Sequence, residues 1–320
     1  MKVIIQIPCY NEEETLPVTV ADLPKKVDGV DVIEYLIIDD GSEDRTVETA
    51  REIGVHHIVR QAKNKGLAKG FMTGIDACLR LGADIIVNTD GDNQYCGHDI
   101  PLLIKPILEN KAEVTVGDRQ TDTIEHFSAL KKKLQKFGSS VVRKASGSEV
   151  IDTTSGFRAY SRDAAMRLNV LSDYSYTLET IISAGKQKVA IENVPIRTND
   201  KLRESRLFKS MGNYIQKSGT TIIRTYSQVK PLKVFGISGI VFFLLGLGTM
   251  IRYLVFYFSG EGSGHVQSLL LGVMFMLIGF QTGIFGLLAD AVSANRKINE
   301  ELLYRVKKLE YDKYSDGEEK

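Results

Sequence analysis

The sequence predicts an α/β domain with a largely parallel sheet, followed by two helices long enough to span a membrane. Three observations support this fold class. Short apolar segments rich in β-branched residues alternate with segments of helical periodicity as far as Leu81. Acidic residues follow directly after several of these apolar segments. Two long apolar runs stand late in a chain that is otherwise polar and mixed.

The strands and helices of the first part can be placed from these patterns. Strands are expected at Val3–Ile7, Tyr35–Ile38, His57–Arg60, Asp84–Asn88 and Glu113–Gly117. Helices are expected at Glu13–Leu23, Thr46–Ile53, Leu67–Leu81 and Ser175–Ala184. Such an alternation forms a sheet covered by helices, and ligands bind at the carboxyl ends of its strands.

Composition and charge narrow the possible functions. The formal net charge is +1, so no nucleic-acid partner is expected. The three cysteines, Cys9, Cys78 and Cys96, are far apart and odd in number, which predicts neither a disulfide framework nor a zinc site. A reducing, cytosolic setting for the first domain is the simpler interpretation.

The two apolar runs, Val234–Phe258 and Leu269–Leu288, are each long enough as helices to cross the roughly 30 Å of a hydrocarbon core. The alternative is a pair of buried helices in a large core. Lysines precede the first run and Arg296 and Lys297 follow the second, whereas the connector has no Lys or Arg. The positive-inside rule then predicts a multi-pass protein of the cell membrane, with the first domain and both termini in the cytosol.

Two further helices flank these runs. From Leu207, apolar residues recur at helical spacing with basic residues between them, which is typical of a helix in the membrane interface or of one packed on the domain. A short apolar stripe after the second run favours helix pairing and a homo-oligomer. It consists of Ile298, Leu302, Val306 and Leu309. The predicted division is a cytosolic domain at 1–206, an interfacial helix at 207–231, a two-helix membrane anchor at 232–290 and a cytosolic helix and tail at 291–320.

The strongest chemical pattern is the acidic motif Asp90-Gly-Asp92-Asn-Gln94, directly after the fourth strand. Two carboxylates one residue apart at a strand end can hold Mg²⁺ or Mn²⁺, and Gln94 adds a neutral oxygen. We therefore expect Asp90, Asp92 and Gln94 to be metal ligands whose ion neutralises a diphosphate. A solvated acidic turn is the alternative for this motif alone.

The first two strand ends add groups suited to a nucleotide. Asp39 and Asp40 precede Gly41 in a tight turn, where their carboxylates can accept hydrogen bonds from a base or from ribose hydroxyls. Tyr10 can stack on a nucleobase, and Glu12 can bond a ribose or a base edge. Three strand ends would then contact base, ribose and metal-bound diphosphate in one crevice.

Together these motifs resemble those of family 2 glycosyltransferases. The matching residues are Pro8-x-Tyr10-Asn11-Glu12, Asp39-Asp40-Gly41-Ser42-x-Asp44-x-Thr46, Gly66-Leu67-Ala68-Lys69-Gly70 and Asp90-x-Asp92-x-Gln94. In order and spacing they are most similar to the polyprenyl-phosphate (dolichol-phosphate) sugar synthases. The resemblance implies a GT-A-like fold. It also implies a nucleotide site formed by Pro8, Tyr10, Glu12, Asp39, Asp40, Lys69 and Asp90.

The resemblance extends to Asp152-Thr-Thr-Ser-Gly156-Phe157-Arg158, a segment that lines the acceptor side in that family. Asp152 is the candidate general base for a hydroxyl acceptor, whereas a phosphate acceptor is already ionised and needs no base. Cations on the acceptor side are expected to be Arg119, Lys133, Arg203 and Arg206. An exposed helix face is the alternative for Lys133. The residues expected to act in catalysis are Asp92, Asp152 and Arg206.

The resemblance thus implies an inverting, metal-dependent transfer of a sugar from a nucleotide-sugar to polyprenyl phosphate at the cytosolic membrane face. A UDP-sugar is favoured over GDP-mannose because Asp40 can accept the N3–H of uracil. A membrane-bound polysaccharide transferase with a hydroxyl acceptor is one alternative, which the lack of tryptophan and of further spans disfavours. A non-catalytic membrane scaffold is another.

Overall fold

The structure is a computed structural model that describes residues 1–120, 143, 147, 149–170, 176–200, 220, 227, 231–260 and 262–315. The chain divides into two compact units, residues 1–219 with 300–320, and residues 220–299. The end of the chain therefore packs with the first unit. The boundaries that hydropathy predicts, after residues 206, 231 and 290, remain predictions.

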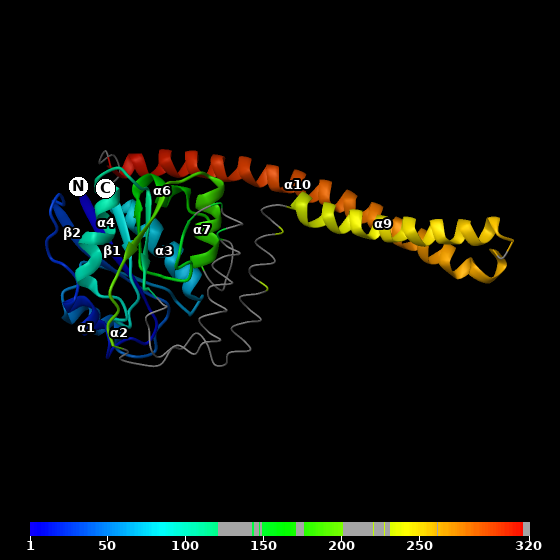
Figure 1. The fold of residues 1–320 in the computed structure, drawn as a ribbon. Helices are drawn as coiled ribbons and strands as arrows, with labels where there is room; N and C mark the ends of the chain where they lie inside the picture. Colours follow the sequence, from blue (N-terminus) through cyan, green and yellow to red (C-terminus); the bar gives the residue numbers. More distant parts are fainter. Residues whose placement is uncertain are drawn as a thin grey trace. The chain divides into compact units, whose positions relative to one another are not determined.

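The first unit is built on a mixed sheet, which in the described part of the chain has seven strands in the order β3-β2-β1-β4-β6-β5-β7 (Figure 1). The strands are β1 Lys2–Cys9, β2 Val32–Asp39, β3 His57–Arg60, β4 Ile85–Asn88, β5 Val114–Asp118, β6 Arg158–Ser161 and β7 Ile191–Pro195. The first four are parallel neighbours, as predicted, whereas β6 runs antiparallel to β4 and β5.

Helices cover both faces of this sheet. They are α1 Leu16–Ala21, α2 Thr46–Glu52, α3 Leu67–Arg80, the 3₁₀ helix η1 Gly97–Asp99, α4 Ile100–Leu108, α6 Arg162–Arg167 and α7 Tyr176–Lys186. Alternate residues of β1 point to opposite faces. Ile5 and Ile7 join a buried apolar cluster with Leu103 of α4. Gln6 faces α3, where a Cβ on Gly74 would lie 2.2 Å from its Oε1.

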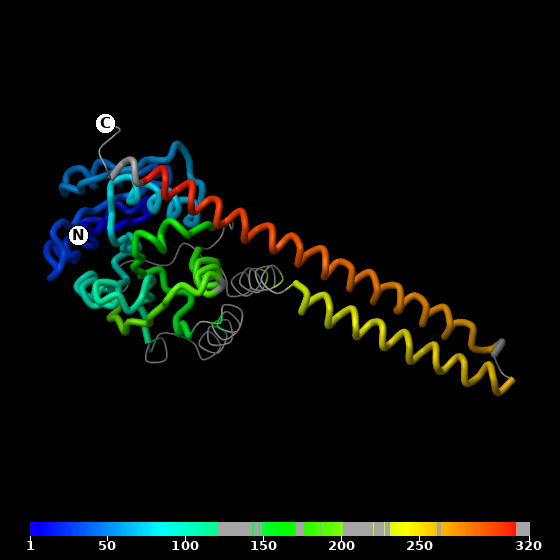
Figure 2. The backbone as a smooth tube through the Cα atoms, turned by 90° about the horizontal axis from the view of Figure 1, so that it is seen from above, coloured from blue at the N-terminus to red at the C-terminus, as the bar shows by residue number. Residues whose placement is uncertain are grey.

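The second unit is a hairpin of two long helices, α9 Pro231–Phe258 and the first part of α10 Val266–Ser315, joined through η2 Gly262–His265 (Figure 1 and Figure 2). Both helices are long and apolar enough to cross a membrane, with mean hydropathies of 2.2 and 1.9 in their most apolar windows. Only 11% and 17% of the residues in these most apolar stretches are buried, whereas the core helices of a soluble protein are mostly buried. This agrees with the predicted pair of membrane helices.

Glycines bring the two helices of the hairpin close together. A Cβ on Gly279 of α10 would lie 2.6 Å from the backbone nitrogen of Phe243 and 2.7 Å from the carbonyl oxygen of Gly239. A Cβ on Gly246 of α9 would lie 2.7 Å from the carbonyl oxygen of Gly272. Small residues that allow such close backbone approach are typical of helix packing in membranes.

The last turns of α10 belong to the first unit and pack on α3 and α6. Tyr311 is 1% exposed, and its hydroxyl donates a hydrogen bond to the Asp76 carboxylate of α3. Glu310 pairs with Arg80 at 2.6 Å. On the α6 side, the hydroxyl of Tyr304 donates a hydrogen bond to the Asp163 carboxylate. The predicted pairing stripe lies away from this contact, because its residues Leu302, Val306 and Leu309 are more than half exposed.

Candidate active site

Three neighbouring strands bring the predicted motifs to one edge of the sheet. β1 lies between β2 and β4 and is parallel to both. The segments that follow these strands therefore leave the sheet side by side. The backbone nitrogen of Asp40 donates to the carbonyl oxygen of Cys9 at 2.9 Å. A Cβ on Gly91 would lie 3.2 Å from the sulfur of Cys9 and 3.3 Å from Cγ of Glu12. The predicted convergence of these three segments is confirmed.

The segment after β1 is fixed by hydrogen bonds to both neighbours. Asn11 adopts a left-handed φ of 56° and donates its backbone N–H to the Ser42 hydroxyl at 2.9 Å. Glu12 is buried, and its carboxylate accepts a 2.7 Å hydrogen bond from the Thr15 hydroxyl. The same hydroxyl lies 2.8 Å from the carbonyl oxygen of Gly91. The Thr15 hydroxyl thus links Glu12 to the acidic motif, and the predicted contact of Glu12 with a nucleotide remains a prediction.

The paired acids after β2 organise the turn and the loop that leads into α3. The fully buried Asp39 accepts the backbone N–H of Ser42 at 3.0 Å and lies 3.3 Å from the Arg60 guanidinium. The two oxygens of Asp40 accept the backbone N–H groups of Lys65 and Gly66, each at 2.8 Å. Because a carboxylate offers about four lone-pair sites, Asp40 keeps acceptor capacity for a ligand.

Gly41 is required by this arrangement. Its φ of 73° is left-handed, and a Cβ there would lie 2.7 Å from the backbone of Lys63. The loop 63–66 therefore closes over the acid pair. Lys69 stands exposed in the first turn of α3, just beyond this loop. Pro8 of β1 packs near the same helix, and its Cβ lies 4.0 Å from the position of a Cβ on Gly70.

A pocket of about 540 Å³ opens beside these residues. It is lined by Tyr10, Gly41, Ser42, Glu43, Arg60, Gln61, Ala62, Lys63 and Asn64. Its volume suits a small-molecule ligand, and it combines an aromatic ring with two cationic side chains. Tyr10 was predicted here, but Arg60 and Lys63 were not. Arg60 ends β3 and Lys63 follows it, and β3 is a parallel strand whose end faces the same edge as the acidic motifs, so that placement could have indicated both.

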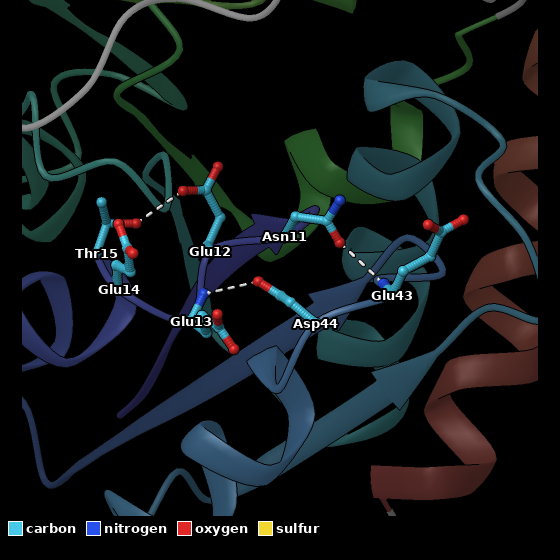
Figure 3. Close-up of a pocket in the computed structure, with 7 residues that line it drawn as sticks. All are labelled: Asn11, Glu12, Glu13, Glu14, Thr15, Glu43 and Asp44. Atoms are coloured by element: carbon cyan, nitrogen blue, oxygen red, sulfur yellow. Dashed lines mark hydrogen bonds between the residues drawn. The ribbon is translucent and has the colours of Figure 1, made fainter.

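A second pocket, of about 370 Å³, lies along the segment after β1 (Figure 3). It is lined by Asn11, Glu12, Glu13, Glu14, Thr15, Glu43 and Asp44. Burial alone would raise the pKa of Asp44, but hydrogen bonds from Thr46 and from the backbone of Glu13 lower it below its ordinary value. A pocket lined by so many carboxylates repels a diphosphate, so we assign no donor binding to it.

The acidic motif after β4 has a donor set that fits a hard divalent cation. Asp90, Asp92 and Gln94 are all partly exposed and follow one another in a loop that turns at the left-handed Asn93. The amide nitrogen of Gln94 donates to Asp92 at 2.9 Å. The buried Oδ1 of Asn93 finds no hydrogen-bond donor among the described residues. A Cβ on Gly156 would lie 3.2 Å from both carboxylate oxygens of Asp90, so the acceptor-side segment meets the motif here.

Arg119 and Asp152 form an ion pair beside this motif. The Arg119 guanidinium donates from Nε and Nη2 to the two Asp152 oxygens at 2.6 and 3.0 Å, and from Nη2 to the Thr154 hydroxyl at 2.8 Å. Asp152 is 3% exposed. Burial alone would raise the pKa of Asp152, but the adjacent guanidinium lowers it. A carboxylate that is kept ionised by an adjacent guanidinium is a weak general base. The ion pair therefore disfavours the predicted role of Asp152 as a general base.

A buried polar network holds the segment 152–156 in place. Arg158 is fully buried and donates to the carbonyl oxygens of Thr153 and Ser155 at 3.0 and 2.8 Å. Asn88, the last residue of β4, donates to the carbonyl oxygen of Gly156 at 2.8 Å. The backbone N–H of Gly156 donates to the Tyr95 hydroxyl at 2.9 Å. The sequence motif contains Arg158, but sequence analysis gave it no role because burial depends on the tertiary fold.

Three of the predicted cations, Lys133, Arg203 and Arg206, lie outside the described residues, as does most of the predicted interfacial helix. Their assignments stay predictions. The part of the site that the structure describes therefore comprises the nucleotide-sized pocket, the acidic motif and the Arg119–Asp152 pair.

The fold and these strand ends define a glycosyltransferase with a GT-A-like α/β domain. A crystal structure of glucosyl-3-phosphoglycerate synthase from Mycobacterium tuberculosis has the same fold, with a TM-score of 0.55, 18% identity and coverage of 71% of this chain and 77% of the other. Residues 4–168, more than half of the chain, match the family model Glycosyl transferase family 2. The chain belongs to this family of enzymes, which excludes the non-catalytic scaffold.

Two relatives show how far the similarity extends. The chain is 32% identical over 216 residues to UDP-N-acetylglucosamine–dolichyl-phosphate N-acetylglucosaminyltransferase from Methanococcus voltae, covering 60% of this chain and 83% of the relative. It is 25% identical over 315 residues to the glycosyltransferase AglJ from Haloferax volcanii, covering 96% of this chain and 98% of the relative. The second match therefore includes the segment that contains the two apolar helices.

Proposed function

We propose that this glycosyltransferase transfers a sugar from a nucleotide-sugar to a polyprenyl phosphate at a membrane surface. The ion pair between Arg119 and Asp152 is the observation that favours a phosphate acceptor. A hydroxyl acceptor needs a base to remove its proton, and Asp152 is held ionised against a guanidinium. A phosphate is already ionised near neutral pH and needs no base. The dolichyl-phosphate acceptor in the name of the Methanococcus voltae relative supports this choice.

We further propose that Asp90, Asp92 and Gln94 hold Mg²⁺ or Mn²⁺. Their oxygens are the ligands that hard divalent cations prefer, and Gly156, in the segment predicted to line the acceptor side, lies close to Asp90. When bound, the ion neutralises the diphosphate of the donor. The Mycobacterium tuberculosis synthase that shares the fold was crystallised with UDP and Mn²⁺, which supports the assignment.

The nucleoside would occupy the pocket lined by Tyr10, Arg60 and Lys63. Tyr10 would stack on the base, and the two cations would lie near the ribose and phosphates. Asp40 would accept the N3–H of uracil, so a UDP-sugar is favoured over GDP-mannose. Pro8, Glu12, Asp39 and Lys69 would complete the nucleotide site, either by contact or by holding its loops.

The reaction would be a direct displacement. An oxygen of the acceptor phosphate forms the new bond to the anomeric carbon while the bond to the nucleotide diphosphate breaks, so the configuration inverts. Arg119 would orient the acceptor phosphate, helped by the predicted Lys133, Arg203 and Arg206. The two apolar helices would anchor the enzyme with its catalytic domain and termini in the cytosol. A homo-oligomer remains part of this proposal.

The acceptor can be tested with full-length protein in detergent. We expect transfer of label from a nucleotide-sugar to polyprenyl phosphate, and none to the polyprenol of the same chain length. UDP-sugars and GDP-mannose would be compared as donors. Asp92→Asn should lower the rate by at least about a hundredfold, since several kcal/mol of charge stabilisation depend on the ion. Asp28→Asn, which changes an exposed carboxylate on the loop after α1, should leave the rate unchanged.

Asp152→Asn separates the two acceptor classes. With a phosphate acceptor, the variant should keep the shape of the wild-type pH–rate profile even if its rate falls. A base for a hydroxyl acceptor would instead contribute an acid limb to that profile, and the variant would lose it. Equal transfer to polyprenol and polyprenyl phosphate would refute the proposed acceptor.

A further inference from the structure

A second group of potential metal-binding side chains combines Asp22 with Cys96 and His98, which closely follow the acidic motif in the sequence. Asp22 at the end of α1, Cys96 before η1 and His98 within η1 each offer one ligand atom, and these atoms all lie within 4.8 Å of one another. Nδ1 of His98 lies 2.7 Å from Oδ1 of Asp22. Cys96 is a free thiol that is 8% exposed, whereas the side chain of His98 is 69% exposed.

The backbone is shaped to bring these side chains together. Gly97 stands between Cys96 and His98, and a Cβ there would lie 2.5 Å from the carbonyl oxygen of Asp22. Only glycine allows this approach. The backbone N–H of Gly97 donates to Oδ2 of Asp22, which fixes the carboxylate between the thiol and the imidazole. The adjacent Asp99 is anchored by the guanidinium of Arg197, whose Nε and Nη2 donate to its Oδ1 at 3.0 and 2.6 Å.

A thiolate, an imidazole and a carboxylate form a donor set that differs from that of the acidic motif. Sulfur and imidazole ligands select Zn²⁺ over Mg²⁺ or Mn²⁺. With metal–ligand bonds of about 2.0–2.3 Å, the ligand atoms of a tetrahedral zinc ion are about 3.3–3.8 Å apart. Nδ1 of His98 and Oδ1 of Asp22, now 2.7 Å apart, would therefore separate by roughly half an ångström, and any ligand atoms near the 4.8 Å limit would move closer together; the exposed His98 side chain can adjust to both changes. Three protein ligands would leave the fourth position to water.

We propose that Asp22, Cys96 and His98 form a zinc-type metal site, separate from the site of the donor diphosphate. The spacing of the cysteines did not predict it, because its third ligand comes from a helix 74 residues earlier in the chain, at position 22 against 96. Cys96 would bind the metal as a thiolate, so binding is accompanied by release of protons.

The position of this site connects it to the acidic motif. α1 ends at the site with Asp22, and the hydroxyls of Thr15 and Thr19 lie 2.8 and 3.1 Å from the carbonyl oxygen of Gly91. The segment from Gly91 to His98 is therefore fastened to α1 near both of its ends. A metal ion at Asp22, Cys96 and His98 would strengthen the contact between the end of α1 and the segment from Cys96 to His98. It would stabilise the loop that contains Asp92 without contacting the donor.

The site can be tested with Co²⁺, which reports thiolate coordination through a ligand-to-metal charge-transfer band. Full-length protein without a polyhistidine tag would be titrated in detergent under reducing conditions, with saturating Mg²⁺ to occupy hard-ligand sites. We expect the band to saturate at one Co²⁺ per chain and to be displaced by an equivalent of Zn²⁺. Binding should raise the midpoint of thermal unfolding.

Matched variants identify the ligands. Cys96→Ser should abolish the band, and His98→Gln should weaken Co²⁺ binding by at least about tenfold, since even outer-shell partners of metal ligands have effects of that size. Cys78→Ser, which removes a buried thiol of α3, should leave the band intact. Asp92→Asn should also leave it intact, so failure of the proposed catalytic metal site would be recognised separately. A wild-type protein without the band, or a band that survives Cys96→Ser, would overturn the proposal.

Discussion

Replacement of Gly156 by alanine tests whether the acceptor-side segment and the acidic motif form one site. The added Cβ would lie 2.9 Å from the Tyr176 hydroxyl and 3.2 Å from both carboxylate oxygens of Asp90. Both separations are shorter than a comfortable carbon–oxygen contact, so a neighbour must move. Tyr176 is fully buried and stacked on Phe71 with ring centroids 3.9 Å apart. The partly exposed Asp90 is therefore the group that yields.

The size of the effect follows from this geometry. One extra methyl group in a packed site costs about 1–3 kcal/mol when its neighbours must shift. Displacement of a positioned group by about an ångström can lower a catalytic rate by about a hundredfold. We expect Gly156→Ala to reduce sugar transfer by about 10- to 100-fold and to weaken Mn²⁺ binding, with only a modest loss of thermal stability.

The measurement combines initial rates of lipid-linked sugar formation with Mn²⁺ affinity by electron paramagnetic resonance. Gly70→Ala is the matched control, because a Cβ there meets only Pro8, at an ordinary 4.0 Å. A Gly156→Ala enzyme with wild-type rate and wild-type Mn²⁺ affinity would contradict the placement of Asp90 against the acceptor segment.

Three further changes test other contacts. Arg119→Met strands the buried Asp152 carboxylate and should destabilise the fold by about 3 kcal/mol at neutral pH. The native pKa of Asp152 is lowered, so its stabilising effect is present at neutral pH and is lost as the pH falls through that pKa. In the variant this pKa rises, so the stability deficit should shrink in acid. Tyr311→Ala empties a buried ring position and should lower the free energy of unfolding by about 3 kcal/mol in denaturant titrations. Gly279→Val should push the two apolar helices apart, lowering the unfolding midpoint in detergent.

Each of these changes has a control in the same region. Leu309→Ala alters the 70%-exposed leucine on the same helix as Tyr311 and should be nearly neutral. Gly248→Val places the same side chain at an exposed position of α9, where a Cβ meets nothing within 4 Å. Equal effects of a change and its control would show that the contact inferred from the structure does not stabilise the protein. For Arg119→Met, a deficit that persists unchanged in acid would contradict the ion pair.

Local pattern was sufficient to predict the strands and helices that surround the proposed nucleotide site. Periodicity placed β1, β2, β3 and β4, and the parallel pairing of neighbours follows from the alternation of strand and helix. The antiparallel β6 between β4 and β5 could not be predicted, since its pairing depends on contacts between residues about seventy positions apart, such as Val87 and Ala159. Such pairing has no signature in a local window of sequence.

The sequence predicted individual residues of the candidate site better than it predicted the contacts between them. Asp152 and Arg119 were each identified, one as a base and the other as a phosphate-binding cation, yet the sequence does not indicate that they neutralise each other. The tertiary fold brings them together, and the adjacent guanidinium lowers the pKa of Asp152 against the effect of burial. Arg60 and Lys63 were missed because cations are common on surfaces and only the sheet places them at the pocket.

The packing of Tyr311 and Glu310 on α3 has a consequence for the order of biosynthesis. The ribosome makes α3 early, but the residues that cover its outer surface emerge only after both apolar helices have been translated. Until then Asp76 and Arg80 lack their partners from α10. The nascent enzyme therefore completes its first unit only when the membrane segments have already been made, so a chain that stalls within α9 would leave an exposed and incompletely packed transferase domain.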